Sequence, residues 1–306
     1  NYATMVLIPA LKAGSADLRT VVSQGGLSGV HAGSRFGFAK VSTDSNVVFD
    51  DPDISTVVIA TRHNSHASLV TAALKAGKHV FVEKPLALTL NELDEIRSVH
   101  NELATKGSVP LLMVGFNRRF APHIVRLRAL IAATPGPKSF IATINAGSIP
   151  SDHWTQDRSI GGGRILGEAC HFIDLLRHLA GHPIVGFQAM AMVSPARDSA
   201  SFTLSFADGS IGTVHYLANG SKAFPKERIE VFGGNGVIQL DNFRRMKGYG
   251  WHGFRCMNLW RQDKGHNACA AVFLDAVRSR TAVPIPSNEL FEVSRFAIEI
   301  ATAVSS

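Results

Sequence analysis

The stretch His79-Val80-Phe81-Val82-Glu83-Lys84-Pro85 joins an apolar run to two charges and a proline. The run predicts a buried strand, and Glu83 and Lys84 then follow at its carboxyl end, the edge of an open α/β sheet where ligands bind. Pro85 biases Lys84 away from helical backbone angles and so holds it extended. A lysine in a partly dry cleft beside a carboxylate can transfer a proton, because burial and its partner tune its pKa. A solvated charge pair in a loop is the alternative that this stretch alone leaves open.

Strand and helix patterns alternate on both sides of this stretch. Helices are predicted over residues 1–11, 28–36, 67–76 and 90–104, and strands over 18–22, 57–60 and 109–115. Gly77 ends the helix before the central strand, and Thr89-Leu90-Asn91-Glu92 forms a capping box. The alternation predicts an α/β fold with a Rossmann-type, doubly wound parallel sheet.

The alternation of predicted strands and helices ends after Phe116-Asn117-Arg118-Arg119-Phe120. Strand-like runs then dominate, at 139–145, 185–192, 201–206, 211–216, 228–233 and 236–240, with helices over about 167–179, 267–278 and 288–303. Ala207-Asp208-Gly209-Ser210 predicts a hairpin turn between two of the strands. We expect an α+β domain on a mainly antiparallel sheet, so that residues 1–117 and 118–306 form two domains.

Composition excludes several protein classes. Hydrophobic residues make up 45% and charged residues 18% of the 306 residues, which is typical of globular proteins. The apolar runs are too short to span a membrane, and no signal pattern is present. Three cysteines without a C-x-x-C pair suit free thiols in a reducing compartment, so we expect a cytoplasmic protein.

The net charge of +7 comes from 31 Lys and Arg against 24 Asp and Glu. These charges are scattered and no nucleic-acid motif accompanies them, so we expect no nucleic-acid partner. Attraction for an anionic small ligand, such as a dinucleotide or a nucleotide-sugar, explains the excess equally well.

Several motifs together resemble the Gfo/Idh/MocA family of NAD(P)-dependent oxidoreductases of sugars, cyclitols and related polyols. In the family's order they are Ala60-Thr61…His66, Ala73-Leu74-Lys75-Ala76-Gly77-Lys78-His79-Val80…Glu83-Lys84-Pro85-Leu86, Val114-Gly115-Phe116-Asn117-Arg118-Arg119-Phe120, Gly161-Gly162-Gly163…His171-Phe172-Ile173-Asp174-Leu175, Glu230-Val231-Phe232-Gly233 and Pro284-Ile285-Pro286. The resemblance runs nearly end to end. It implies a Rossmann domain that binds NAD or NADP, followed by a substrate-binding and oligomerisation domain.

The resemblance also concerns the start of the chain. Family members open with a strand and G-x-G-x-x-G or G-x-G-x-x-A, and Asn1-Tyr2-Ala3 would occupy the last three positions. The first strand and the two glycines that cradle the pyrophosphate would then precede Asn1. We therefore expect an N-terminally incomplete Rossmann domain, from an incomplete sequence or a longer polypeptide. A genuine N-terminus on a fold without that strand is the alternative.

The resemblance assigns the site residues. Lys84 and His171 would be catalytic, Glu168 is the third catalytic candidate, and no metal site is expected. The predicted cofactor-binding residues are Tyr2, Ala3, Ser23, Thr61, Arg62, His66 and Glu83, and weaker candidates for substrate contact are Arg118, Trp154, Arg164 and Asp174.

Two departures from the family pattern concern the cofactor. The second predicted strand ends on Ser23-Gln24, not on the Asp or Glu that binds a ribose 2′-hydroxyl in NAD, which leaves NAD and NADP open. Arg62 and His63 replace the proline and asparagine of the family's T-P-N segment. Arg62 can face the adenine or phosphate, or be a solvated side chain.

A third departure concerns the chemistry. Gly167 stands where many relatives have an aspartate one turn before the histidine, and Glu168 follows it. Glu168 is rotated about 100° from Gly167, so it can replace the carboxylate only where the helix begins there or bends. Favouring the helix dipole is its alternative role. His171 and Asp174 share a helical face, and a core pair satisfying each other is the alternative for both.

These residues together predict hydride transfer between a nicotinamide and a sugar, cyclitol or nucleotide-sugar, in which Lys84 and His171 handle the alcohol proton. Expected partners are a small polyol and, through the second-domain sheet, further copies of the chain, with no membrane. Two alternatives remain open. One is a non-catalytic dinucleotide-binding regulator or scaffold on the same fold, and the other is a module of a larger multidomain enzyme.

Overall fold

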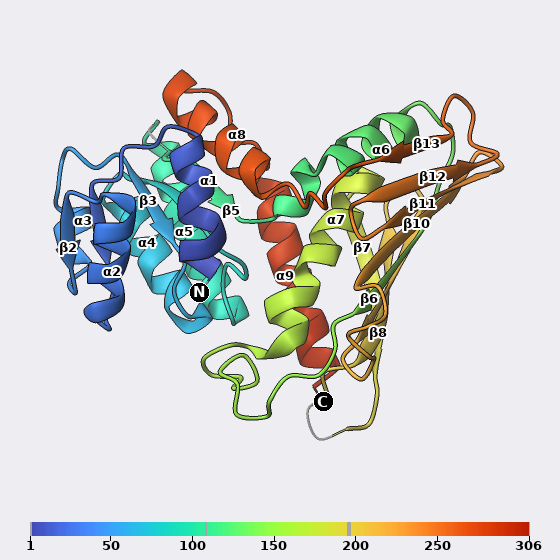
Figure 1. Cartoon of the computed structure of the whole chain (residues 1–306), viewed down its shortest axis with the longest axis horizontal. Coiled ribbons are helices and arrows are strands. Elements are labelled where there is room, and N and C mark those ends of the chain that lie inside the picture. Colours follow the sequence, from blue (N-terminus) through green and yellow to red (C-terminus); the bar gives the residue numbers. More distant parts are fainter. Residues whose placement is uncertain (1, 108, 195–196, 306) are drawn as a thin grey trace.

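Parallel strands flanked by helices form the N-terminal part of the computed structural model, which describes residues 2–107, 109–194 and 197–305 (Figure 1). In chain order the elements are the π-helical turn η1 (Ala3–Leu7), α1 (Ile8–Ala13), β1 (Thr20–Val22), α2 (Leu27–Phe36), β2 (Lys40–Ser42), α3 (Asn46–Phe49), β3 (Thr56–Ile59), the 3₁₀ turn η2 (His63–Ser65), α4 (His66–Lys75), β4 (His79–Val82), α5 (Leu90–Thr105) and β5 (Leu112–Val114). The predicted α/β alternation is confirmed.

The strand predicted from the opening stretch is β4. Its Val80 and Val82 are fully buried, and it pairs in parallel with β3 on one side and β5 on the other. The predicted capping box is also present, because Thr89 accepts from the backbone of Glu92 while Glu92 accepts from the backbone of Thr89. β4 therefore places Glu83 and Lys84 at the carboxyl edge of the sheet.

The parallel sheet is divided. Among the described residues, β1 pairs only with β2, and β3 pairs only with β4, which in turn pairs with β5. Each group is parallel, but β1 and β3 are not bonded to each other. One edge of each strand therefore borders the space between the two groups.

The second part of the chain forms one large sheet covered on one face by helices (Figure 1). Its elements are η3 (Asn117–Phe120), α6 (Pro122–Ala132), β6 (Ser139–Asn145), the π-helical turn η4 (Ile165–Ala169), α7 (Cys170–Ala180), β7 (Ile184–Ala191), β8 (Ala200–Phe206), β9 (Ile211–Leu217), β10 (Glu227–Gly233), β11 (Gly236–Asp241), β12 (Arg245–Tyr249), β13 (Cys256–Asn258), α8 (His266–Ser279) and α9 (Ser287–Ala303).

The strand order is β13-β12-β11-β10-β6-β9-β8-β7, and every pairing is antiparallel except that of β6 with β9. The mainly antiparallel sheet is thus confirmed. The turn predicted at residues 207–210 joins β8 to β9, with Gly209 at φ +85°.

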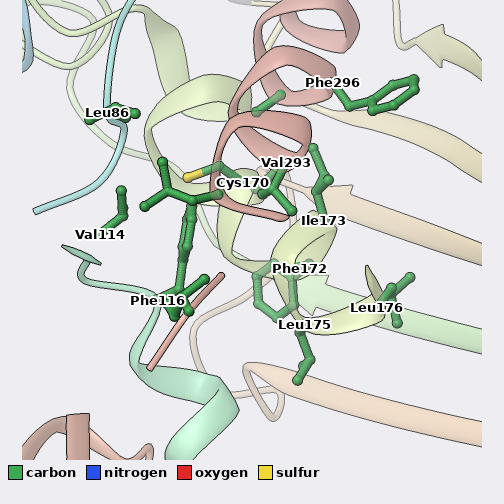
Figure 2. Close-up of a cluster of buried hydrophobic side chains, with 14 of the residues drawn as sticks. Leu86, Val114, Phe116, Cys170, Phe172, Ile173, Leu175, Leu176, Val293 and Phe296 are labelled. Atoms are coloured by element: carbon green, nitrogen blue, oxygen red, sulfur yellow. The ribbon is translucent and has the colours of Figure 1, made fainter. Parts of the chain in front are cut away.

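Helices α7 and α9 pack between the large sheet and the parallel strands. Figure 2 shows Val114 and Phe116 from the end of β5 gathered with Phe172 of α7 and Val293 of α9 in one apolar cluster. Almost every side chain of α7 is buried, so the helix has no freedom to rotate. His171 is therefore held in a fixed direction.

Helix α8 returns to the N-terminal part of the chain. It packs along α1, the ring of its Phe273 lies 5.5 Å from that of Phe81, and Arg278 donates to the carbonyl of Ser15 over 2.8 Å. A segment late in the sequence therefore supports the parallel strands, and the boundary near residue 117 stays a prediction. No helix within the described residues has the length and apolar character needed to cross a membrane.

Candidate active site

A cavity of about 1840 Å³ lies where the parallel strands end and α7 begins. It is lined by residues at the carboxyl ends of β1, β3 and β4 (Ser23, Thr61, Glu83 and Lys84) and by His171 from α7. Ligand sites usually measure about 300–1000 Å³. This cavity is larger because it continues into the space between β1 and β3.

The structure brings the predicted cofactor-binding residues to one place. All seven line the cavity: Tyr2, Ala3, Ser23, Thr61, Arg62, His66 and Glu83. Because parallel strands end at the same edge, residues scattered over the N-terminal part of the chain converge there.

Lys84 crosses from the parallel strands to the second domain. Its half-buried side chain donates from Nζ to the carbonyl of Gly167 over 2.8 Å. The backbone behind it is fixed by His66, whose Nδ1 donates to the carbonyl of Pro85 over 2.7 Å. The ammonium is thus held at the start of α7, inside the cavity that His171 also lines.

Glu83 lies behind Lys84 with 8% of its surface exposed. Burial raises the pKa of its carboxyl, while the charge of Lys84 and a hydrogen bond from the Tyr2 hydroxyl oppose the rise. A Cβ on Gly115 would come within 2.8 Å of the Glu83 carboxylate, so position 115 admits only glycine while Glu83 keeps this place.

His171 presents a neutral imidazole to the cavity. Burial, followed by the charges of Arg118 and Lys84, lowers its pKa well below the ordinary value of 6.5. Its Nδ1 has no hydrogen-bond partner within the described part of the chain, and its ring packs edge-on to Phe116 at 6.2 Å. A neutral imidazole can accept a proton from an alcohol at its unprotonated ring nitrogen.

Glu168 sits on the π-helical turn η4, which precedes α7. The side chain lines the cavity. Its carboxylate accepts from the Tyr216 hydroxyl of β9 and lies 3.6 Å from Arg164. A catalytic role for Glu168 stays a prediction, because these contacts draw the carboxylate toward the large sheet.

The structure contradicts the substrate-contact role predicted for Asp174. The side chain is fully buried, and its two oxygens accept from Nε of Arg119 over 2.8 and 2.9 Å. Because α7 is buried all round, sharing a face with His171 does not bring Asp174 into the cavity.

Arg164 is also placed elsewhere than predicted. Its guanidinium is buried under the large sheet, donates to the carbonyl of Gly147 over 2.6 Å and lies 5.4 Å from the ring of Tyr216. It is therefore a structural residue of the loop base. Arg118 and Trp154, the other two substrate candidates, do line the cavity.

A buried charge cluster was missed by the sequence reasoning. Glu227 accepts from Nε and Nη2 of Arg118 over 3.2 and 2.9 Å and from Nζ of Lys264 over 2.7 Å. All three residues line the cavity. They lie 109 and 37 residues apart, and no local pattern signals pairs of that kind.

This cluster predicts a pH-dependent stability difference. Burial raises the pKa of Glu227, but Arg118 and Lys264 outweigh it and lower the pKa from 4.5 to about 2. When folding lowers the pKa of a carboxyl, the group stabilises the folded state at pH values above its pKa in the unfolded chain. This contribution disappears as the pH falls toward its pKa in the folded chain. Glu227→Gln should therefore lower the free energy of unfolding at pH 7 by up to about 3 kcal/mol.

Urea unfolding at several pH values measures this difference. The gap between Glu227→Gln and the parent chain should narrow as the pH falls from about 4.5 toward 2. Glu230→Gln, on the same strand and half-exposed, serves as the control. A gap that stays constant over this pH range would show that Glu227 is not ionised in the folded chain.

Comparisons with known proteins agree with this architecture. Residues 2–116 match a family model described as an oxidoreductase family with an NAD-binding Rossmann fold, and residues 136–239 match the GFO/IDH/MocA C-terminal domain. Among solved structures, levoglucosan dehydrogenase in complex with NADH and levoglucosan superposes with a TM-score of 0.87 at 23% identity, over 100% of this chain and 95% of that one. At this identity the likeness concerns the fold.

Two curated relatives are similar in sequence. A myo-inositol 2-dehydrogenase of Thermotoga maritima is 29% identical over 218 residues, which cover 69% of this chain and 63% of the relative. A levoglucosan dehydrogenase of Pseudarthrobacter phenanthrenivorans is 30% identical over 247 residues, which cover 70% of this chain and 62% of the relative. The chain thus spans about three fifths of the length of these relatives.

Proposed function

Because the chain belongs to the Gfo/Idh/MocA family of oxidoreductases, we propose that it is an NAD- or NADP-dependent dehydrogenase or reductase of a sugar, cyclitol or nucleotide-sugar. The observation that carries this proposal is the meeting of Lys84 and His171 in one cavity with the ends of three parallel strands. The names of the two relatives, which act on inositol and levoglucosan, point to a polyol CH–OH group as the reacting group.

The cavity fits a dinucleotide in its size and in the strand ends that line it. The fit is weaker at the end of β1, where Ser23 and Ser28 share a hydrogen bond of 2.6 Å in place of a ribose-binding carboxylate. Since hydroxyl groups can face either a 2′-hydroxyl or a 2′-phosphate, the choice between NAD and NADP stays open.

In the proposed reaction the protein handles the proton. A bound nicotinamide supplies the acceptor or donor of the hydride. Lys84, aimed from the end of β4, hydrogen-bonds the reacting oxygen and stabilises the charge that develops on it. His171, kept neutral by burial and nearby cations, accepts the alcohol proton at a ring nitrogen.

A non-catalytic dinucleotide-binding regulator is the second candidate, and Gly167 and the divided sheet favour it. Gly167 brings no carboxylate to the start of α7. Titration with NAD and NADP, followed by a screen of polyols for reduction of the bound cofactor, separates the two functions. Reduction by a polyol supports the dehydrogenase, whereas tight binding of cofactor without reduction by any polyol or nucleotide-sugar favours the regulator.

We propose further that the space between β1 and β3 accepts one more parallel strand. Both flanking strands present an unpaired edge within the described residues, and both line the cavity. Such a strand would end beside η1, where a glycine-rich turn can direct backbone N–H groups at phosphates.

An extended chain tests this placement. Adding an apolar strand and a G-x-G turn before Asn1 should tighten NAD or NADP binding about tenfold or more, since charge-assisted hydrogen bonds to phosphate contribute about 1.5–3 kcal/mol. An extension of equal length made of glycine and serine is the control. Equal dissociation constants for both extensions, measured by calorimetry, would contradict the placement.

We propose a cytoplasmic homo-oligomer in which copies meet through the uncovered face of the large sheet. That face carries exposed apolar side chains on several strands, among them Met190, Ile211 and Phe232. Side chains alternate between the two faces along each strand, and helices cover only one of these faces. The other face therefore exposes its apolar side chains. The mass in solution, measured by light scattering, tests the association.

A further inference from the structure

The loop of residues 147–164, which joins β6 to η4, is a compact structure in its own right. Arg164 closes its base by donating to the Gly147 carbonyl over 2.6 Å. Within it, the N–H groups of His153 and Gly161 donate to the carbonyls of Pro150 and Asp157 over 3.1 and 2.7 Å. In Figure 1 it is the yellow-green loop at the lower middle of the view.

This loop forms one wall of the cavity. Trp154 and Ile160 both line it, as do Lys84 and His171. A loop in such a place determines how much of the substrate side is open to water.

The short segment η2 fastens the loop to the dinucleotide-binding part. His63 Nδ1 bonds to the Gly161 carbonyl over 2.7 Å, and the Asn64 N–H donates to the Ile160 carbonyl over 3.0 Å. The rings of His63 and Trp154 meet edge to face, 4.7 Å apart and inclined by 76°. Because a carbonyl only accepts, Nδ1 of His63 carries the proton.

The imidazole of His63 is held in this position by burial. Only 7% of its surface is exposed, and burial, opposed by the Gly161 bond and reinforced by Lys84 and His66, lowers its pKa to about 3. It therefore stays a neutral ring whose single N–H is committed to the loop across the working pH range.

Gly167 makes room for this ring. A Cβ on Gly167 would lie 3.0 Å from Cε1 of His63, closer than most real contacts. The carbonyl of the same glycine accepts the hydrogen bond from Lys84. The ring of His63 therefore packs closely against Gly167, whose carbonyl accepts the hydrogen bond from Lys84.

We propose that His63 is a positioning residue that clasps the 147–164 loop onto the dinucleotide-binding part and so holds Trp154 in the substrate wall. This proposal adds a positioning residue to the proposed dehydrogenase function. Only its kinetic prediction rests on that function. His63 touches the loop and Gly167, and it acts on the substrate through Trp154 and Ile160.

Limited trypsin digestion tests the clasp without reference to activity. Arg158 is an exposed arginine of the loop, and cleavage there, followed by mass spectrometry, reports how often the loop opens. His63→Ala should raise the cleavage rate at Arg158 about tenfold, and His63→Phe, which keeps a ring but loses the donor, should raise it less. Cleavage at other sites reports global unfolding, and His31→Ala, an exposed histidine of α2, is the matched control.

A double-variant cycle tests the fit with Gly167. Gly167→Ala should accelerate cleavage at Arg158 in the parent chain, because its methyl group displaces the His63 ring. It should cause no further acceleration once His63 is alanine, since the two changes act on one contact. Equal acceleration in both backgrounds would contradict the fit.

The kinetic arm uses the polyol that reduces the cofactor. His63→Ala should raise KM for this polyol several-fold more than it changes kcat, since the loop wall binds substrate but moves no proton. Unchanged cleavage at Arg158 in His63→Ala overturns the clasp. If the parent chain shows no turnover, the proposed dehydrogenase function is wrong instead. The digestion result then still tests whether His63 holds the loop.

Discussion

Lys84→Ala is expected to lower turnover about 10²–10⁴-fold, the usual contribution of a group that assists proton transfer. In the cavity the ammonium is the polar group directed from the carboxyl end of β4, and its hydrogen bond to the Gly167 carbonyl holds it between the two parts of the chain. In the proposed mechanism, alanine removes both the hydrogen bond to the reacting oxygen and the charge that stabilises the developing alkoxide.

Two further variants make this result specific. Lys84→Arg keeps a positive charge, but its larger, planar guanidinium cannot take the place of the compact ammonium, so it should restore little turnover. Lys75→Ala, an exposed lysine at the end of α4, should leave kcat unchanged. Activity that survives in Lys84→Ala would remove the lysine from the mechanism.

Arg119→Met is expected to lower the free energy of unfolding by about 3–5 kcal/mol, the usual cost of leaving a buried charge unpaired. Arg119 is 4% exposed and joins η3 to two helices, because it donates to Asp174 of α7 and to Glu289 of α9. These charges raise its pKa against the opposing effect of burial. Without the guanidinium, the fully buried Asp174 loses the partner of both its oxygens.

Urea unfolding of matched variants measures this cost. Arg295→Met breaks an exposed pair with Glu299 at 3.5 Å and should cost less than about 1 kcal/mol. Arg119→Met combined with Asp174→Leu should recover part of the loss, since no fully buried carboxylate is then left unpaired. Glu289 is partly exposed and still lies 3.9 Å from Arg177. Equal effects of the buried and the exposed variant would show that the Arg119 cluster does not stabilise the junction.

Local patterns predicted the elements that contain the site. The apolar run before Glu83 and the capping box at Thr89 each depend on neighbours in sequence, and both are present as predicted. Strands β2, β12 and β13 were not predicted, because their side chains are mostly polar and exposed and show no apolar alternation.

Such local patterns do not predict contacts between segments that are far apart in the sequence. His63 and Gly161 are 98 residues apart, and Arg119 and Asp174 are 55 apart. Asp174 was misassigned for a related reason. Helical spacing places it on one face with His171, but it does not say whether that face meets a cavity or the core. In a helix buried all round, only the three-dimensional packing separates the two.

A crystal structure with reduced cofactor and myo-inositol tests the central claim most directly, because it shows what Lys84 and His171 contact. We predict an inositol hydroxyl within about 3 Å of Lys84 Nζ and of a His171 ring nitrogen, with the nicotinamide against the same carbon. A polyol bound elsewhere, with Lys84 turned to bulk water, would contradict the assignment of this cavity as a redox site.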